Sequence, residues 1–556
     1  MIFGYKYSGL CEWDTLIRKY SLAGVSFPRL MTSIKGGLVV KTIEKILTFT
    51  LLGLSVCAAL CYAELYKRAP DTLPGILPEM RNPSYWIARM KNPDEVILTP
   101  DAIQRMNGAY KMKMKAPDPF KGVDPDRVPK RENLYKWPGR FIIMPDIYNM
   151  TSSQIASIVR EEISKDIDFM RGKYILLSSP QIADIARKKI GKDIDFMTEQ
   201  YLQNVPGLPE NFDRQKYGNI LGIEYADREL DDMEKEMALD LVSDEITIHD
   251  GITVRDALLR IVPTIKPEHI GLNGNWTPPW DVWNVNIVRI STPVAVLHTS
   301  RTGGYLFVLS NEGYGWIRSE DIAFGEKTEI GKFSEPADFV ICTGDRVPFY
   351  TDENCRYVSG WFRMGDRLPL ASKDNTRIIN APSRKMNGRF EVEQAWLAKD
   401  ADVHVGYLPY TLKNIVITAF KLLDNIYDWT MAWYGRNHET TSRDIFACFG
   451  FDLPFNAELF TFFGKNTRVV RPEEGKEAQY RAILANEPFV TIQTCVDGHN
   501  QLFLGEYNGE PIVLDTHGYG YHDKDGIWYE IKRLVVGKMS QPDYFLKTNF
   551  TFLELK

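Results

Sequence analysis

The pattern of hydrophobic positions changes along the chain, from helical in the first half to strand-like in the middle. In residues 152–170, isoleucines recur at the three- and four-residue spacing that lines one face of a helix. A similar stretch follows in residues 178–197, and because two copies are too few for a solenoid we interpret it as a local duplication. We therefore predict a helical domain over residues 65–270.

Proline interrupts the start of this region twice. Residues 66–83 and 115–133 each contain several prolines, which disfavour a continuous helix or a central strand. Between them, Thr99 precedes Pro100 and Asp101, and these residue types are typical of a helix cap and first turn. We expect linkers or surface loops in the two proline-rich stretches and a helix that begins after Thr99.

Short segments with a strand period begin near residue 281. In residues 293–317 apolar and polar positions alternate on both sides of a Gly-Gly pair, a pattern typical of strands joined by a tight turn. A second block of the same kind covers residues 338–372. The two blocks predict two small β-barrels, one over residues 281–328 and one over residues 335–402.

The C-terminal part mixes helices and strands. Thr411 is placed to cap a helix, and residues 440–450 predict a second helix that ends in glycine. A strand over residues 489–493 precedes a hairpin over residues 501–515, whose turn is Asn-Gly. We predict a mixed domain over residues 405–550, and hence an α+β multidomain fold for the chain.

The charge balance argues against one class of partner. The chain has 67 basic and 73 acidic residues, a net charge of -6, so it has no surplus of positive charge for a nucleic-acid footprint. We expect no nucleic-acid partner. A chain of 556 residues is too long to pack around one hydrophobic core, which agrees with several domains in series.

The longest apolar run covers residues 46–63, with three lysines before it and a polar stretch after it. A basic flank, an apolar centre and small residues near the end are typical of an export signal. The run is also long enough to span a bilayer. A cleaved signal and a retained inner-membrane anchor remain equal alternatives for residues 1–64, with the residues before Met31 as an upstream extension. Both predict an exported protein of the periplasm or cell envelope.

Several stretches after residue 80 resemble the multidomain branch of the NlpC/p60 cell-wall cysteine peptidases. They are NPDEVILTPDAI (92–103), LRIVPT (259–264), PVAVLHTS (293–300), YGWI (314–317) and GYLPYTLKNIVITAFKLLDNIYDW (406–429). The resemblance implies a helical N-terminal stabilising domain, two bacterial SH3 domains and a papain-like peptidase domain. It also implies a substrate, since members cleave peptidoglycan stem peptides between γ-D-glutamate and the diamino acid.

The position of the family's nucleophile is altered. That chemistry needs a thiolate at the N-terminus of a helix, within a Tyr-x-Trp-Gly-Gly segment followed by Asp-Cys-Ser. Here the segment is YDWTMAWYGRNHETTSRDIF (427–446), which places Asn437-His438-Glu439 on Asp-Cys-Ser. His438 therefore takes the place of the cysteine. Cys448 lies ten residues further on, in an apolar run, and is expected to be a core residue.

The position of the family's base is kept. The segment DGHNQLFLG (497–505) resembles the start of the strand with the catalytic histidine, which gives His499 that role and Asp515 the role of the third, orienting residue. A strict two-residue turn at Asn508-Gly509 would put these two side chains on opposite faces of the sheet. A one-residue bulge after the turn would bring them to the same face, and the resemblance favours the bulged form.

Three functional interpretations follow. The first is a pseudo-peptidase that binds stem peptides or a partner. The second is an active γ-D-glutamyl-L-diamino acid endopeptidase; the cysteine nearest to the site is Cys495, which from its spacing is poorly placed to face His499. The third is a metal site formed by His438 and His499 with Asp515 or His517, and with metal-assisted hydrolysis. We favour the first and expect no cofactor, with His438 filling the vacated position.

Further side chains are candidates for ligand contact or for a disulfide. Tyr314 and Trp316 are candidates because the first SH3 domain borders the substrate site in this branch, although the pattern fits barrel core equally well. Trp429 and Glu439 flank the altered position. Cys342 and Cys355 are expected either to form a disulfide or to remain free thiols.

Overall fold

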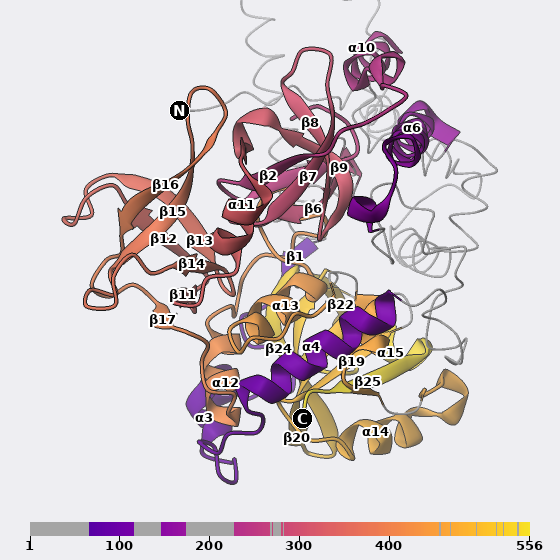
Figure 1. Cartoon of the computed structure of the whole chain (residues 1–556). Coiled ribbons are helices and arrows are strands. Elements are labelled where there is room, and N and C mark those ends of the chain that lie inside the picture. Colours follow the sequence, from indigo (N-terminus) through magenta and orange to yellow (C-terminus); the bar gives the residue numbers. More distant parts are fainter. Residues whose placement is uncertain are drawn as a thin grey trace, which may run out of the picture. The chain divides into compact units, whose positions relative to one another are not determined.

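The computed structural model of the chain is drawn in Figure 1. It describes residues 66–115, 146–173 and 227–556, apart from 267–268, 271–279, 282, 455–456, 467–468, 496–497, 519, 526 and 542–543. The apolar run 46–63, the second copy at 178–197 and most of the proline-rich stretch 115–133 lie outside the described residues. Among the residues that are described, no helix has both the length and the apolar character needed to cross a bilayer.

The first described segment packs onto the C-terminal domain. It contains β1 (Tyr66–Arg68), the 3-10 helix η2 (Pro78–Arg81), α3 (Pro83–Ile87) and α4 (Pro100–Met114). The predicted start of α4 is confirmed, because Thr99 Oγ1 accepts a hydrogen bond from Ala102 N at 3.3 Å. Leu73, Met80 and Trp86 are buried in the same core cluster as Phe446 of the C-terminal domain. This segment therefore belongs to the C-terminal core and not to a separate helical domain over 65–270.

The remaining described helices of the N-terminal half cover the first barrel. They are α6 (Ser152–Asp168), the π-helical turn η5 (Phe169–Lys173), α10 (Asp227–Met237) and the 3-10 helix η6 (Leu239–Leu241). Helix α6 begins with a capping box between Thr151 and Gln154. Its buried Ile155 and Ile163 share one core cluster with the barrel, as the predicted apolar stripe requires.

The first barrel is a seven-stranded antiparallel sheet with strand order β10-β2-β7-β8-β9-β3-β6. The strands are β2 (His249–Thr253), β3 (Ala257–Arg260), β6 (Asn284–Val288), β7 (Pro293–Thr299), β8 (Tyr305–Ser310), β9 (Gly313–Arg318) and β10 (Ile322–Phe324). Strands β2 and β3 correct the prediction that the helical domain extends to residue 270 and that the barrel begins at 281. Leu259 of β3 is buried in the barrel core, and Ile252 of β2 is buried in a neighbouring cluster with Ile330 of α11. A separate two-stranded pairing joins β4 (His269–Ile270) to β5 (Trp280–Asp281).

Helix α11 (Lys327–Ser334) leads into the second barrel, which has two small sheets of orders β14-β11-β17 and β13-β12-β16-β15. The strands are β11 (Phe339–Cys342), β12 (Arg346–Tyr350), β13 (Val358–Arg363), β14 (Arg367–Pro369), β15 (Ile378–Arg384), β16 (Phe390–Trp396) and β17 (Val403–Val405). Val340, Phe349 and Phe362 form the centre of its own core. These strands lie within the predicted block, extended to residue 405.

The C-terminal domain has a six-stranded sheet of order β18-β25-β19-β20-β21-β24. Its elements are α12 (Leu412–Phe420), α13 (His438–Ala447), η8 (Ala457–Phe462), β18 (Lys465–Asn466), η9 (Pro472–Glu474), α14 (Lys476–Leu484), β19 (Thr491–Cys495), β20 (Asn500–Tyr507), β21 (Glu510–His517), β22 (Gly520–His522), β23 (Trp528–Glu530), β24 (Arg533–Lys538), α15 (Tyr544–Lys547) and β25 (Phe550–Glu554). Helix α13 packs on one face, where Ser442 Oγ donates to Asn500 Oδ1 at 2.6 Å. Helix α14 packs on the other face, with Ile483 beside Phe503. The whole is the predicted α+β multidomain fold.

Candidate functional site

The tip of helix α13 carries an imidazole. Asn437 caps the helix, since its Oδ1 accepts from Thr440 N at 2.9 Å and its own N–H donates to Thr440 Oγ1 at 3.0 Å. His438 is the first residue of the helix. The positive end of the helix dipole lies at this position and disfavours further positive charge. The structure thus places His438 where the resemblance predicts the nucleophile.

A bulge in the hairpin of β20 and β21 brings the predicted histidine and carboxylate together. The turn itself is a strict two-residue turn, with Tyr507 opposite Glu510 and positive φ at Asn508 and Gly509. The register shifts between Phe503 and Gly505, so the extra residue lies in the strand before the turn and not after it. The predicted outcome is confirmed although the predicted place of the bulge is wrong: His499 Nε2 and Asp515 Oδ1 are 3.0 Å apart.

Asp515 orients the ring of His499. Its second oxygen, Oδ2, accepts from Gln501 Nε2 at 2.7 Å, and the carboxylate is buried. Burial works to raise the pKa of Asp515, but attraction and a hydrogen bond from His499, with help from His517 and Gln501, hold that pKa below its ordinary value. An ionised carboxylate only accepts, so His499 donates through Nε2 and its Nδ1 is left as the acceptor.

The lowered pKa predicts a pH dependence of stability. A depressed carboxyl pKa contributes stability above the unfolded value of about 3.9, and that contribution is lost as the pH falls through the lower folded value. Wild type is therefore expected to be more stable than Asp515→Asn at pH 7. The difference in their free energies of unfolding should shrink as the pH falls below about 4, since protonated Asp515 is neutral like asparagine. Denaturant titrations of both proteins at several pH values measure it, and a difference that does not change with pH contradicts the assignment.

The imidazole rings of His438 and His499 lie next to each other. The ring centroids of His438 and His499 are 4.6 Å apart with an interplanar angle of 31°, and the ring of Tyr427 lies 6.4 Å from His438, nearly parallel to it. His517 lies at the same site, with its ring 6.4 Å from His499. The side chain of His438 therefore occupies the space next to His499 in which a nucleophile would stand.

Trp429 and Glu439 lie at this site, as predicted. Asn437 Nδ2 donates to Trp429 O at 3.1 Å and to Glu439 Oε2 at 3.2 Å, and both residues are half-buried. The cap of α13 thus fixes the backbone at Trp429 and the carboxylate of Glu439 on either side of His438.

Of the two alternatives for Tyr314 and Trp316, ligand contact or barrel core, the structure places both side chains in the core. They are 1 % and 0 % exposed and pack around Phe307, whose ring lies 6.0 Å from Tyr314 and 5.2 Å from Trp316. Both belong to the core cluster that the first barrel shares with α6 and α10. Because helices cover this face of the sheet, its aromatic residues serve packing. The alternation of residues along β9 is the same whether these rings contact a ligand or form the barrel core.

The described cysteines are free thiols and do not form a disulfide between Cys342 and Cys355. Cys448 is the C-cap of α13 and is fully buried, and burial raises its pKa to about 12. The expectation that Cys448 is core is confirmed. Burial likewise raises the pKa of the Cys342 thiol well above its ordinary value.

Cys495 differs from its prediction. Its N–H donates to His499 O at 2.8 Å and its carbonyl accepts from Gly498 N at 3.0 Å, so the strand register places it directly opposite His499, on the same face of the sheet. The spacing alone did not reveal this tight turn. Its side chain is only 1 % exposed, accepts from Thr548 Oγ1 at 3.1 Å and packs with Phe503 and Phe550.

The alternative metal set has no geometric support. Over the part of the chain that the structure describes, no group of three or more His, Cys, Asp and Glu side chains is arranged to hold a metal ion. His499 already directs Nε2 to Asp515, and its ring lies next to the ring of His438. The arrangement is that of an oriented histidine packed against a second imidazole.

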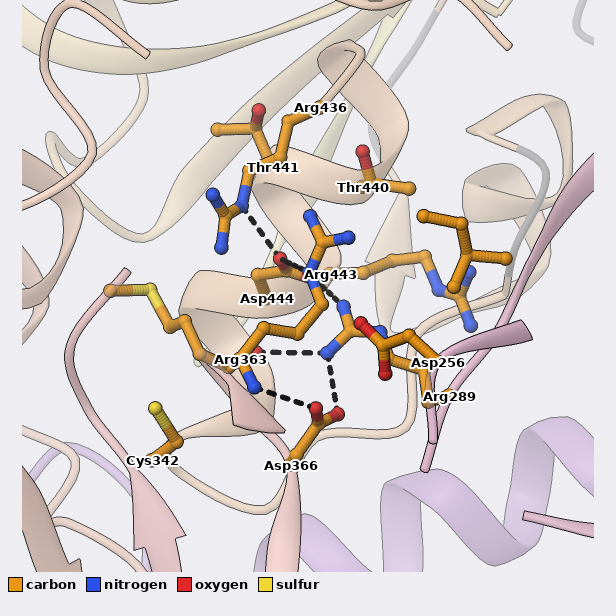
Figure 2. A network of polar contacts seen from close by, with 12 residues as sticks. Asp256, Arg289, Cys342, Arg363, Asp366, Arg436, Thr440, Thr441, Arg443 and Asp444 are labelled. Atoms are coloured by element: carbon orange, nitrogen blue, oxygen red, sulfur yellow. Dashed lines mark hydrogen bonds and ion pairs between the residues drawn. The ribbon is translucent and has the colours of Figure 1, made fainter. Parts of the chain in front are cut away.

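A buried charge network behind the site was not predicted (Figure 2). Asp444 of α13 is 0 % exposed and accepts from Arg436 Nε at 2.7 Å. It also pairs with Arg289 of the first barrel, and Arg363 Nε of the second barrel lies 3.5 Å from its Oδ2. Arg289 in turn donates to Asp366 Oδ1 at 2.7 Å. The network ties α13 to both barrels.

Two further contacts join the site to the first barrel. Arg443 of α13 makes a two-pronged ion pair with Glu312, at 2.7 and 3.0 Å. Asn284 Nδ2 donates to Thr430 O at 2.6 Å, and the resemblance places Thr430 and Met431 on the two glycines of the family's segment. The next residue, Met431, has φ 59, a left-handed conformation that favours glycine. Sequence could flag Arg443 and Asp444 only as charges in a buried helix, because apart from Arg436 the partners Glu312, Arg289 and Arg363 lie far away in the sequence.

The fold is that of an NlpC/P60 endopeptidase with bacterial SH3 domains. A family described as SH3 domain (SH3b1 type) matches residues 277–318. The structure is similar to that of an NlpC/P60 endopeptidase from Photobacterium damselae subsp. piscicida, with a TM-score of 0.57 and 13% identity over 88% of this chain and 98% of that one.

A more distant match is an NlpC/P60 family protein from Bacillus cereus ATCC 10987. It has a TM-score of 0.35 and 15% identity and covers 54% of this chain and 98% of its own. No curated protein matches the sequence.

Proposed function

We propose that this chain is an exported, peptidoglycan-associated protein that binds stem peptides at the site around His438 and is impaired as a peptidase. The observation that carries the proposal is the imidazole at the tip of α13, 4.6 Å from the ring of His499. Export rests on the apolar run 46–63, which serves either as a cleaved signal or as an inner-membrane anchor.

The altered tip removes the attacking atom of the ancestral reaction. Acyl transfer by this fold needs a thiolate that forms a covalent intermediate and is later released. An imidazole at position 438 lacks that chemistry, and its ring lies next to the ring of His499, with the centroids 4.6 Å apart. The remaining groups still suit peptide binding: the ring of His499, the ionised Asp515 behind it and the half-buried Glu439 offer donors and acceptors to a polar peptide.

The proposal predicts binding without cleavage. Purified protein should sediment with cell-wall sacculi and bind a defined L-Ala-γ-D-Glu-diamino acid tripeptide, while mass spectrometry finds no released stem fragments. His438→Ala should keep sedimentation within about twofold of wild type, because the contribution assigned to it is space filling. Loss of sedimentation for wild type contradicts the binding role, and released fragments contradict the impairment.

One observation favours a second candidate, a cysteine endopeptidase in which Cys495 is the nucleophile. Its register opposite His499 makes the pair a candidate for proton transfer. The near-complete burial of its side chain weighs against access by substrate. Digestion of the tripeptide by wild type and by Cys495→Ala, each with and without a thiol alkylator, separates the two. Alkylator-sensitive turnover that disappears in Cys495→Ala would establish the enzyme and overturn the pseudo-peptidase.

A further inference from the structure

A rigid loop presents two aromatic side chains beside the candidate site. In the loop before α13, the buried Asp428 accepts from Trp433 N at 2.8 Å and from Gly435 N at 3.0 Å through the same oxygen. Met431 and Tyr434 hold left-handed conformations with φ 59 and 60. A Cβ at Gly435 would lie 2.5 Å from Asp428 Cβ, so the loop tolerates no larger residue there. Such conformations have a cost and persist where the surroundings enforce them.

The outer face of the second barrel meets this loop. Arg346 and Arg363 are directly opposite each other on β12 and β13. Arg346 donates to Tyr434 O and Arg363 to Gly435 O, each at 3.0 Å. The next residue of β13 on the same face is Trp361, two positions from Arg363. The loop and this face of the barrel thus form one continuous surface.

Three aromatic side chains of this surface are open to solvent. Trp361 is 49 % exposed, Trp433 48 % and Tyr434 38 %. Among the tryptophans whose burial the structure describes, Trp361 and Trp433 are the two exposed ones. These exposed rings indicate a contact surface. Burying them against a ligand is favourable, and because the backbone is already held in place, binding costs little conformational entropy. The surface is rimmed by the exposed charges of Asp345 and Arg346.

We propose that this aromatic surface (Trp361, Trp433 and Tyr434) binds the glycan strand of peptidoglycan. The inference rests on the proposed function, because stem peptides are covalently attached to glycan strands, and a peptide held at His438 brings its strand alongside. The loop that ends in the cap of α13 also carries Trp433 and Tyr434, so the two ligand parts meet adjoining residues. Flat rings with charged neighbours suit sugars, which offer an apolar C–H face and hydroxyls at the edge.

The test uses full-length protein and two separate probes. The first is glycan strands freed of stem peptides, with an N-acetylglucosamine hexamer as a soluble version, and the second is the stem tripeptide alone. Titration calorimetry should show Trp361→Ala/Trp433→Ala binding both glycan probes about tenfold more weakly than wild type. Its affinity for the tripeptide should stay within about twofold of wild type.

Controls keep the result interpretable. Met386→Ala removes a fully exposed apolar side chain elsewhere on the second barrel and should bind glycan as wild type does. Unchanged unfolding midpoints show that the double variant folds. The proposal is overturned if wild type does not bind the glycan probes or if the double variant binds them equally well. It is also overturned if the double variant instead loses a co-purifying envelope protein, which would make the surface a protein docking site. A failed proposed function shows separately, as absent tripeptide binding in wild type.

Discussion

Replacing His438 by cysteine is expected to produce a thiol-dependent peptidase. The substitution puts a sulfur at the first position of α13, where the helix dipole favours a thiolate. It also removes the ring that lies 4.6 Å from His499 and opens the approach to Nδ1, while Asp515 already holds the tautomer that accepts a proton there. We expect tripeptide hydrolysis at least about 100-fold above wild type, measured by release of the diamino acid.

Three variants define this result. His438→Ser opens the same space without a thiolate and should stay at the wild-type level. His438→Cys/His499→Ala should lose the gained activity, because the base is removed, and an alkylator should abolish the activity of His438→Cys alone. If His438→Cys reacts with the alkylator but hydrolyses nothing, the loss of function extends beyond the missing sulfur. Met431 with its left-handed backbone is then the next position to change, to glycine.

The relation between sequence and site is clearest at His438, His499 and Asp515. Their assignment followed from the resemblance of three short segments, around residues 438, 499 and 515, to the NlpC/p60 family. All three signals are local, and the structure brings the side chains together. The sequence did not reveal on which side of the turn the bulge lies. A bulge in either strand puts His499 and Asp515 on the same face of the sheet, and only the pairing of Phe503 with Val513 distinguishes the two positions.

The errors came from features that depend on distant segments. Strands β2 and β3 look like a continuation of a helical region until their partners β7, β9 and β6 are known. Tyr314 and Trp316 alternate as a ligand-facing stripe would, but α6 and α10 cover them. In each case the local pattern fitted two environments, and a contact remote in sequence selected one.

The contacts of the network around Asp444 could not be predicted from the local sequence. We expect this network to matter most for the stability of the protein. Arg289, Arg363 and Arg436 converge on one fully buried carboxylate. Burial, together with the charges of Arg436 and Arg289, lowers the pKa of Arg363 well below its ordinary value. The cations therefore repel one another in a dry environment, and Asp444 is a carboxylate that pairs with all three.

Asp444→Asn is expected to lower the free energy of unfolding by about 3–5 kcal/mol, since it leaves buried positive charge without its partner. The matched control is Asp452→Asn, because Asp452 pairs with Lys111 at 2.7 Å with both side chains largely exposed and should contribute at most about 1 kcal/mol. Denaturant titration followed by tryptophan fluorescence measures both. Because the network joins α13 to both barrels, the variant should also shift the NMR signals of the His438 and His499 rings, whereas the control should leave them in place. Equal small losses in the two variants would show that the arginines find other counter-charges, such as Asp366 and Asp345, and that Asp444 does not hold the helix tip against the barrels.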